Sequence, residues 1–303
     1  MKMTQNEYHT PVLLEACMKG LNIQPHGVYV DATFGGGGHA REILKHLGAN
    51  GKLVGFDQDP DAKDNSIQDE RFLFIPENFK YIKRFLKFYG VTEVDGILAD
   101  FGVSSHQFNT AERGFSIRYD AKLDMRMDQT QDLSALKIIN EYAVEELIRI
   151  FRQYAELKMA PKVASAISAE REIKPIETTF ELNKILEPFF PKHKTNKFLA
   201  QIYQALRIEV NAELDALKDF LNQTVDLLKP GGRLCLISYH SLEDRLVKHF
   251  IRSGNFEDNI KKDMFGNIEK PLKNIGKLIV PTENEIQVNN RARSAKLRIA
   301  EKL

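Results

Sequence analysis

Residues 28–40 read VYVDATFGGGGHA, in which a short apolar run leads directly into four consecutive glycines. Residues 28–31 predict a β-strand and residues 39–47 predict a helix, so the glycines form the turn between them. Glycine permits a tight turn and lets a ligand approach the backbone closely, because it has no Cβ. A strand, a glycine-rich turn and a helix in this order are typical of α/β folds that bind a nucleotide-like cofactor at the turn.

Further apolar runs alternate with helical segments after this turn. Residues 52–57, 71–75 and 95–100 predict three more strands, and residues 233–238 predict a fifth. Such runs are typical of parallel strands that helices cover on both faces. We therefore expect an α/β fold with a mostly parallel sheet.

The alternation is interrupted by a long helical stretch, residues 109–205. Connections within α/β units usually have about 2–6 residues, so this stretch predicts an inserted all-helical domain. The chain then divides into residues 1–108 with 206–303, which form the cofactor-binding domain, and residues 109–205, which form the insertion.

Some local boundaries are also predicted. Thr10-Pro11 predicts the start of an N-terminal helix, because proline is favoured at the first helical position. Helical spacing continues beyond the insertion, after a bend, until Lys229-Pro230-Gly231-Gly232 ends it. Residues 255–290, rich in Lys, Asn and Gly, predict an irregular arm.

The composition is that of a globular protein, with 303 residues, of which 43% are hydrophobic and 28% charged. Cys17 and Cys235 are the only cysteines, too few for a disulfide framework or a four-thiolate metal site, and we expect no metal. Residues 1–14 lack the apolar run of a signal peptide, and no segment has the apolar length of a membrane span. These features predict a cytoplasmic location.

The net charge is only +1, which does not by itself indicate a nucleic-acid-binding protein. From residue 271 onward, however, seven cations face three anions. This basic C-terminal segment suits phosphate contacts, although a solvated surface explains it equally well.

Two cofactors fit the glycine turn. Gly35, Gly37 and Ala40 satisfy the dinucleotide spacing GxGxxA, and Asp57 follows at the distance expected of a ribose-binding acid. Asp31 favours S-adenosylmethionine, because a carboxylate before the glycines repels a pyrophosphate but accepts hydrogen bonds from an α-amino group. Asp100 favours it too, since it places a second acid at the sheet edge where ligands bind.

Structural explanations for the same residues stay open. Asp31 is also a suitable turn or capping residue, and His39 is suited to cap the helix that it opens. Phe79 is either core or a stacking surface for adenine.

Motifs along nearly the whole chain carry a family resemblance. The chain resembles the RsmH family (formerly MraW), the ribosomal small-subunit RNA cytosine-N4 methyltransferases. The LDMRM and HSLEDR strings are the most specific. The matching stretches are residues 9–15 (HTPVLLE), 37–39 (GGH), 101–105 (FGVSS) with Gln107, 113–116 (RGFS), 123–127 (LDMRM), 204–208 (QALRI), 238–245 (SYHSLEDR) and 293–298 (RSAKLR).

The resemblance implies a class I (Rossmann-like) methyltransferase fold with an inserted helical substrate-recognition domain. The implied activity is S-adenosyl-L-methionine-dependent methylation of the N4 amine of a specific cytidine in 16S ribosomal RNA, near the decoding centre. The implied partner is small-subunit ribosomal RNA within the assembling subunit, whereas the oligomeric state, monomer or homodimer, stays open. The implied cofactor contacts are Gly37, Gly38, His39, Asp57, Phe79, Asp100 and Gln107.

Departures from the family pattern are mild. Ala40, Phe101, His106 and Tyr239 stand where serine, leucine, proline and phenylalanine are common in the family.

The cysteines bear on the chemistry. Pyrimidine C5-methyltransferases need a cysteine nucleophile. Cys17 falls in a predicted helix and Cys235 inside a predicted strand, so direct transfer to nitrogen is expected. Asp100 is the first candidate to orient and deprotonate the amine. His240 and Ser241 are the second candidates, although ion pairs of Glu243, Asp244 and Arg245 give that segment an equally good structural reading.

Basic side chains predict the RNA contacts. Arg113, Arg118 and Arg126 cluster early in the insertion and are candidates to bind phosphates, as are Arg293 and Lys296 in the basic segment. Arg126, between Met125 and Met127, is alternatively a partly buried structural arginine. The alternative functions are methylation of another nucleic acid, a nicotinamide-dependent oxidoreductase and a catalytically silent RNA-binding assembly factor.

Overall fold

The computed structural model describes residues 11–260, 262, 264–265 and 270–303, which form two compact units. The sheet unit combines the chain up to Gly102 with Leu214–Leu303. The helical unit is Val103–Glu213. The predicted insertion, residues 109–205, falls inside the helical unit, and helix α9 (Thr195–Asn211) continues past residue 205 without a break.

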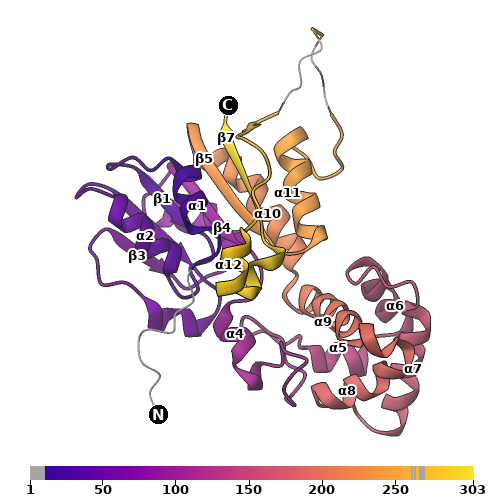
Figure 1. Ribbon diagram of the computed structural model, residues 1–303. Coiled ribbons are helices and arrows are strands. Elements are labelled where there is room, and N and C mark those ends of the chain that lie inside the picture. Colours follow the sequence, from indigo (N-terminus) through magenta and orange to yellow (C-terminus); the bar gives the residue numbers. More distant parts are fainter. Residues whose placement is uncertain (1–10, 261, 263, 266–269) are drawn as a thin grey trace. The chain divides into compact units, whose positions relative to one another are not determined.

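A seven-stranded sheet forms the centre of the sheet unit (Figure 1), in the order β3-β2-β1-β4-β5-β7-β6. The first five strands pair in parallel, whereas β7 pairs antiparallel with both β5 and β6. The expected α/β class with a mostly parallel sheet is therefore confirmed. The strands are β1 (Val28–Asp31), β2 (Lys52–Phe56), β3 (Phe72–Ile75), β4 (Val94–Asp100), β5 (Leu228–Ser238), β6 (Leu272–Asn274) and β7 (Lys296–Lys302).

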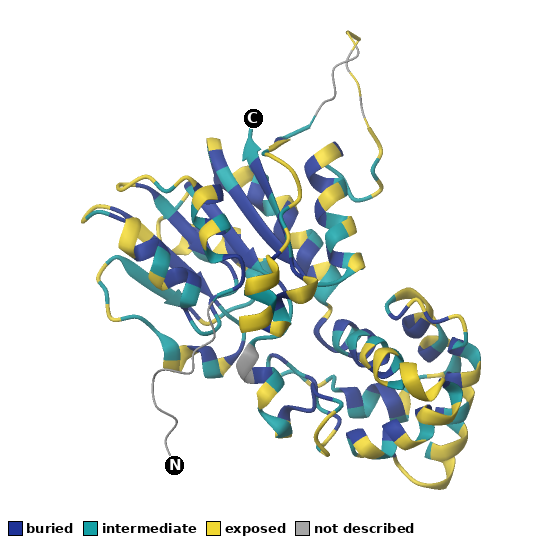
Figure 2. Cartoon of the chain, viewed as in Figure 1, coloured by how far each residue is buried: buried dark blue, intermediate teal, exposed yellow. Residues whose placement is uncertain are grey.

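Helices cover both faces of this sheet, because successive strand residues point to opposite sides. Ile97 and Ala99 of β4 belong to the core beneath α3, α10 and α11, whereas Leu98 belongs to the core beneath α1 and α2. Figure 2 shows the strands as mostly buried and the outer helix surfaces as exposed. The helices are α1 (Leu14–Leu21), α2 (Gly38–His46), α3 (Ile82–Phe88), α10 (Glu213–Leu227), α11 (Ser241–Ser253) and α12 (Glu283–Val288).

The helical unit has an apolar core of its own, formed by the inward sides of its longer helices and by Leu123, Met125 and Met127. The LDMRM string lies in the loop before α5. There Asn211 accepts from the N–H of Met127 (2.8 Å) and donates to the carbonyl of Met125 (2.9 Å), which ties the loop to the end of α9. Besides α9, the helices are α4 (Ser105–Asn109), α5 (Ala135–Glu141), α6 (Val144–Gln153), α7 (Ala160–Ile173) and α8 (Thr179–Leu186).

The structure corrects or restricts two local expectations and confirms a third. Thr10 lies outside the described residues, and Pro11 precedes α1 instead of opening it, since the helix begins at Leu14. The predicted irregular arm contains β6 and α12 among its described residues. The bend beyond the insertion is confirmed at Ala212, whose left-handed backbone (φ +47°) separates α9 from α10.

Candidate functional site

Acidic and hydroxyl side chains gather at the carboxyl edge of the parallel strands. Asp31 is the last residue of β1 and Asp100 is the last residue of β4. Because β1, β4 and β5 are parallel neighbours, their ends meet at one edge. The Oγ1 atom of Thr33, just beyond β1, accepts a hydrogen bond of 2.6 Å from the N–H of Asp100. This bond ties the ends of the two central strands together.

The glycine turn lies at the same edge and is held by Asp57. The Oδ2 atom of Asp57 accepts from the N–H of Gly35 (2.7 Å), and its Oδ1 atom accepts from the N–H of Asp59 (2.9 Å). Gly35 has φ +49° and Gly37 has φ +72°, a left-handed conformation that favours glycine. A Cβ added at Gly35 would meet nothing closer than 4.0 Å, whereas one at Gly38 would come within 2.3 Å of Pro11. The turn is thus open at Gly35 and tightly packed at Gly38.

Asp31 is buried with an incomplete set of partners. Its side chain is 1% exposed, and its Oδ1 atom accepts from the N–H of Thr33 (3.2 Å). Its Oδ2 atom is buried without a hydrogen-bond partner among the residues that the structure describes. Burial raises the pKa of Asp31 to about 7, and the nearby carboxylate of Asp57 adds to the rise. A cationic donor such as an ammonium group would satisfy Oδ2 and favour the charged form.

Asp100 is partly buried and is bonded to Tyr239, the residue that follows β5. The Tyr239 hydroxyl donates to Oδ1 of Asp100 at 2.8 Å. Burial raises the pKa of Asp100 to about 7, against the opposing effect of this hydrogen bond, and the charges of Asp31 and Glu243 raise it further. Asp100 therefore titrates close to neutral pH, the range suited to a general base.

His39 and Phe79 are both tied to the core of the sheet unit. The Nε2 atom of His39 lies 3.0 Å from the carbonyl of Val12, so a neutral His39 with the proton on Nε2 links α2 to the segment before α1. Burial lowers the pKa of His39 to about 4, which keeps the ring neutral. Phe79 packs edge-on against Phe101 (5.9 Å) and Phe220 (5.2 Å) but is only partly buried, so both its core and its stacking readings stay open.

Gln107 belongs to the helical unit, within α4. Its Oε1 atom accepts from the N–H of Ser104 (3.0 Å), and its own N–H donates to Oγ of Ser104 (3.1 Å). This reciprocal pair is a capping box at the start of α4. Gln107 thus has a local structural role, and its proposed cofactor contact stays a prediction.

His240 and Ser241 lie at the start of α11. Nδ1 of His240 accepts from the N–H of Glu243 (3.4 Å), and its Nε2 atom lies 3.1 Å from Oε1 of Glu243. The ring therefore caps the helix, whereas Ser241 is exposed. Nδ1 is used by the helix cap, whereas Nε2 lies near Glu243 but is buried without a hydrogen-bond partner among the described residues. His240 therefore stays a second candidate base behind Asp100.

The candidate RNA-binding arginines of the helical unit divide by burial. Arg113 is 6% exposed and donates to the carbonyls of Arg126 (3.0 Å) and Met127 (3.2 Å). Arg126 forms a bidentate pair with Asp124 (2.8 Å for both bonds) and also donates to two loop carbonyls. These contacts favour the structural reading of Arg126 and argue against phosphate binding by either residue. Arg118 is exposed.

The two basic candidates near the C-terminus also differ. Lys296 opens β7, and its Nζ atom lies 3.3 Å from Oδ2 of Asp244 on α11. Arg298 binds the other oxygen of Asp244 at 2.7 Å. Arg293 is exposed. The positive charge predicted from this segment is therefore partly neutralised.

Two contributors to the site, Thr33 and Tyr239, were not among the predicted site residues, although the segment that contains Tyr239 was expected near this sheet edge. Both follow strand ends directly, next to predicted site residues. The pairing of Asp100 with Ile237 places Tyr239 beside Asp100, and this register is the information that the sequence pattern lacked.

A comparison with protein families covers nearly the whole chain. The model of the MraW methylase family matches residues 6–303. This chain belongs to the MraW methylase family. The resemblance found in the sequence is thereby confirmed.

Individual MraW methylase relatives match over their full length. A protein of Christiangramia forsetii is 63% identical over 297 residues, covering 98% of both chains. One of Flavobacterium johnsoniae is 60% identical over 300 residues, covering 99% of both. One of Bacteroides fragilis is 52% identical over 303 residues, covering 100% of both. Each of the three is named ribosomal RNA small subunit methyltransferase H.

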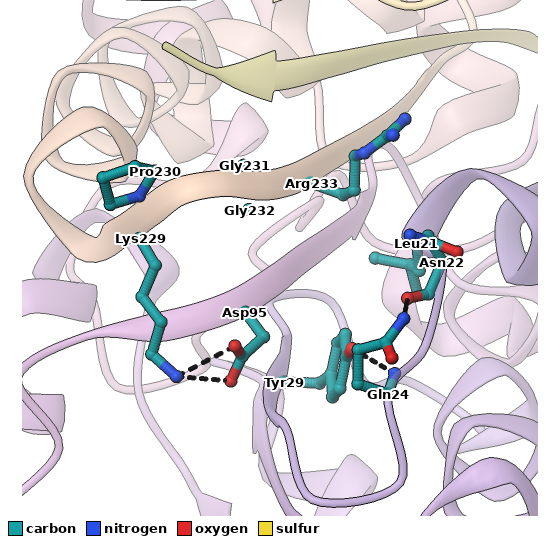
Figure 3. A pocket seen from close by; sticks show the side chains of 10 residues that line it. All are labelled: Leu21, Asn22, Gln24, Tyr29, Asp95, Lys229, Pro230, Gly231, Gly232 and Arg233. Carbon is teal, nitrogen blue, oxygen red and sulfur yellow. Dashed lines mark hydrogen bonds and ion pairs between the residues drawn. The ribbon is translucent and has the colours of Figure 1, made fainter.

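A hollow of about 160 Å³ lies at the opposite edge of the sheet, where the strands begin (Figure 3). Lys229 binds both carboxylate oxygens of Asp95 (2.9 and 2.8 Å), and Oδ2 of Asp95 also accepts from the N–H of Val28. The Tyr29 hydroxyl accepts from the N–H of Gln24. These polar groups bind one another and thereby hold the beginnings of the strands together. None of them is a predicted site residue.

Proposed function

We propose that this chain transfers a methyl group from S-adenosylmethionine to the N4 amine of a specific cytidine in 16S ribosomal RNA, near the decoding centre. The observation that carries the proposal is the full-length match to relatives named ribosomal RNA small subunit methyltransferase H, 63% identical in the first case. The N4 position rests on the family resemblance and on the site chemistry described below.

The residues at the carboxyl edge fit S-adenosylmethionine. Oδ2 of Asp31 is a buried acceptor without a partner among the described residues, and the α-ammonium group of the cofactor suits it. The open face at Gly35 admits a ligand against the backbone, and Asp57 is the acid for the ribose hydroxyls. Gly37, Gly38, His39, Phe79, Asp100 and Gln107 are the remaining proposed contacts. The bound cofactor supplies an activated methyl group on a sulfonium.

The cysteines support direct transfer to nitrogen. Cys17 and Cys235 are both 0% exposed, and burial raises the pKa of each thiol. Neither side chain is therefore available as a nucleophile that adds to a pyrimidine ring. The work of the protein is then to hold the amine in line with the methyl group and to exclude water.

Asp100 is the proposed group that receives the acceptor amine. Its Oδ1 atom accepts from the Tyr239 hydroxyl, so Oδ2 is the oxygen that we propose for the acceptor amine. With a pKa of about 7, the carboxylate can accept the amine proton as positive charge develops on nitrogen. His240 and Ser241 are retained as secondary candidates.

The helical unit is proposed as the substrate-recognition domain. Its exposed Arg118 and the exposed Arg293 are the preferred phosphate contacts, because both guanidinium groups face solvent. The target base has to be unstacked or single-stranded before its amine can reach the site. We propose the assembling small subunit as the source of this RNA.

We also propose that the chain acts in the cytoplasm, because its proposed substrate is the RNA of the assembling small subunit. No helix in the described part of the chain is both long and apolar enough to cross a membrane. Light scattering on the purified chain distinguishes a monomer from a homodimer.

The test is methyl transfer followed by product analysis. Purified chain is incubated with labelled S-adenosylmethionine and with small-subunit particles from a strain that lacks the gene, and the RNA is digested to nucleosides. The expected product is N4-methylcytidine, greatly reduced with the Asp57→Ala variant. Label in another nucleoside would contradict the acceptor. RNA binding without transfer would indicate an assembly factor, and calorimetric binding of NAD in place of S-adenosylhomocysteine would indicate an oxidoreductase.

A further inference from the structure

The hydrogen bond from Tyr239 to Asp100 joins two neighbouring strands at the candidate site. Asp100 ends β4 and pairs with Ile237 of β5, and Tyr239 follows β5 by one residue. The phenol therefore approaches Asp100 from the β5 side, whereas Thr33 holds the N–H of Asp100 from the β1 side. Asp100 is thus fixed from both neighbouring strands.

Both partners of this bond are positioned by their backbones. The N–H of Tyr239 donates to Oε2 of Glu243 at 2.9 Å, and Glu243 is itself 3% exposed in the first turn of α11. Gly102 has φ +111°, a conformation that favours glycine, and a Cβ there would lie at contact distance (3.4 Å) from the Tyr239 ring. The phenol is therefore preorganised to donate to Asp100.

The surrounding groups oppose ionisation of Asp100. Asp31 on β1 and Glu243 on α11 both raise its pKa through their negative charge, and Cys17 on α1 is a buried, neutral thiol close enough to interact. Among the described groups that act on Asp100, Tyr239 is the one that favours the carboxylate. Burial and the nearby carboxylate raise the pKa of Tyr239 well above its usual value, so the phenol stays a neutral donor.

We infer that Tyr239 is the positioning residue of Asp100. The Tyr239 hydroxyl binds Oδ1, favours the ionised carboxylate and leaves Oδ2 for the ligand. The inference deepens the proposed function and rests on it for the identity of that ligand. The contact itself is independent of any ligand.

The direct test measures the ionisation of Asp100 in Tyr239→Phe, which removes one oxygen and keeps the ring. Carbon-13 NMR of protein labelled at the aspartate carboxyl carbons, with Asp100→Asn to assign the signal, gives the titration midpoint without ligand. A hydrogen bond to a charged group is strong enough that its loss should raise this midpoint by about one pH unit or more. Tyr29→Phe, at the opposite sheet edge, is the matched control and should leave the midpoint unchanged.

A second measurement connects the bond to ligand binding. Affinity for S-adenosylhomocysteine is titrated from pH 6 to pH 9 in the parent chain and in Tyr239→Phe. The variant should bind about tenfold more weakly at low pH and approach the parent at high pH, where Asp100 is ionised in both. A loss of equal size at every pH would indicate a merely structural Tyr239 and overturn the inference, as would an unchanged NMR midpoint.

Incorporation of 3-fluorotyrosine covers the case in which Tyr239→Phe does not fold. A more acidic phenol donates a stronger hydrogen bond, so the midpoint of Asp100 should fall, and a midpoint that stays in place overturns the inference. Failure of this inference can be distinguished from failure of the proposed function. If the parent chain transfers no methyl group, the NMR titration, which needs no ligand, still tests the bond between Tyr239 and Asp100.

Discussion

The Oδ2 atom of Asp57 accepts a hydrogen bond of 2.7 Å from the backbone N–H of Gly35. The end of β2 is thereby tied to the glycine turn that follows β1, and the turn keeps its left-handed glycines in place without a ligand. A carboxylate oxygen has two lone pairs and can accept more than one hydrogen bond. Asp57 thus shapes the turn, and it is also the residue that we propose to contact the ribose.

Asp57→Ala should weaken the binding of S-adenosylhomocysteine at least about tenfold. The variant loses charge-assisted hydrogen bonds worth on the order of 1.5–3 kcal/mol each, and it also releases Gly35. Asp57→Asn keeps one acceptor oxygen, so its affinity for S-adenosylhomocysteine should lie between those of the parent chain and of Asp57→Ala. Calorimetry measures the affinities, with circular dichroism as the folding control; unchanged affinity in a folded Asp57→Ala variant contradicts the assignment.

Asp31 should make the sheet unit less stable as pH rises. Its pKa in the folded chain is about 7, above the value of 3.8 for an unperturbed aspartate, so the folded state binds the extra proton between these values. Burial of the neutral carboxyl therefore contributes its full stabilisation of the folded state below about pH 4, and this contribution is lost as the pH rises to about 7. The free energy of unfolding should fall over this range by on the order of 4 kcal/mol at most. The free energy of unfolding in urea, measured at pH 4 and at pH 8, should differ less in Asp31→Asn than in the parent chain. The contribution of Asp100, whose pKa is also raised to about 7, should remain. Parallel curves for the two proteins would show that Asp31 is not the responsible group.

Replacing both cysteines should leave methyl transfer largely intact. The double variant Cys17→Ala/Cys235→Ala loses no nucleophile that direct transfer needs. The small cavities left in the core should lower the free energy of unfolding by about 1–2 kcal/mol. RNA containing 5-fluorocytidine should form no covalent complex with the parent chain, as judged by denaturing electrophoresis. A trapped complex that disappears in the double variant would overturn direct transfer.

Arg118 and Arg126 should behave differently when replaced by alanine. Arg118→Ala removes an exposed charge, so RNA affinity should fall and its salt dependence should decrease by about one unit of slope, with stability unchanged. Arg126→Ala breaks the bidentate pair with Asp124, so stability should fall by on the order of 2 kcal/mol. Filter binding across a salt series and thermal unfolding separate the two effects. Loss of salt dependence in a stable Arg126→Ala variant would reverse the roles.

Much of the sheet could be predicted because its central strands are continuous apolar runs. Residues 28–31 coincide with β1, and residues 95–100 lie within β4 (Val94–Asp100). The antiparallel strand β7 was missed although Leu297 and Ile299 alternate with Lys296 and Arg298. Its charges suggested a basic tail, and only the fold brings them to Asp244.

At the candidate site, the acids at strand ends could be predicted and their partners could not. Asp31 and Asp100 are the last residues of their strands and Asp57 directly follows one, and strand ends are where ligands bind in parallel sheets. The burial of Arg113 depends on backbone carbonyls of residues 126 and 127, which no spacing rule connects to it. Local patterns therefore locate charged groups but do not show which of them the fold uses internally.

The split of the sheet unit around the helical unit has a consequence for the order of folding. β5 pairs with β4, yet every residue of the helical unit is synthesised between them. The contacts of the helical unit are local by comparison, and closing the longer loop costs more conformational entropy. The helical unit should therefore acquire its core on the ribosome while the sheet still lacks its fifth strand. Pulsed hydrogen exchange during refolding should show protection in α6 and α9 before it appears between β4 and β5.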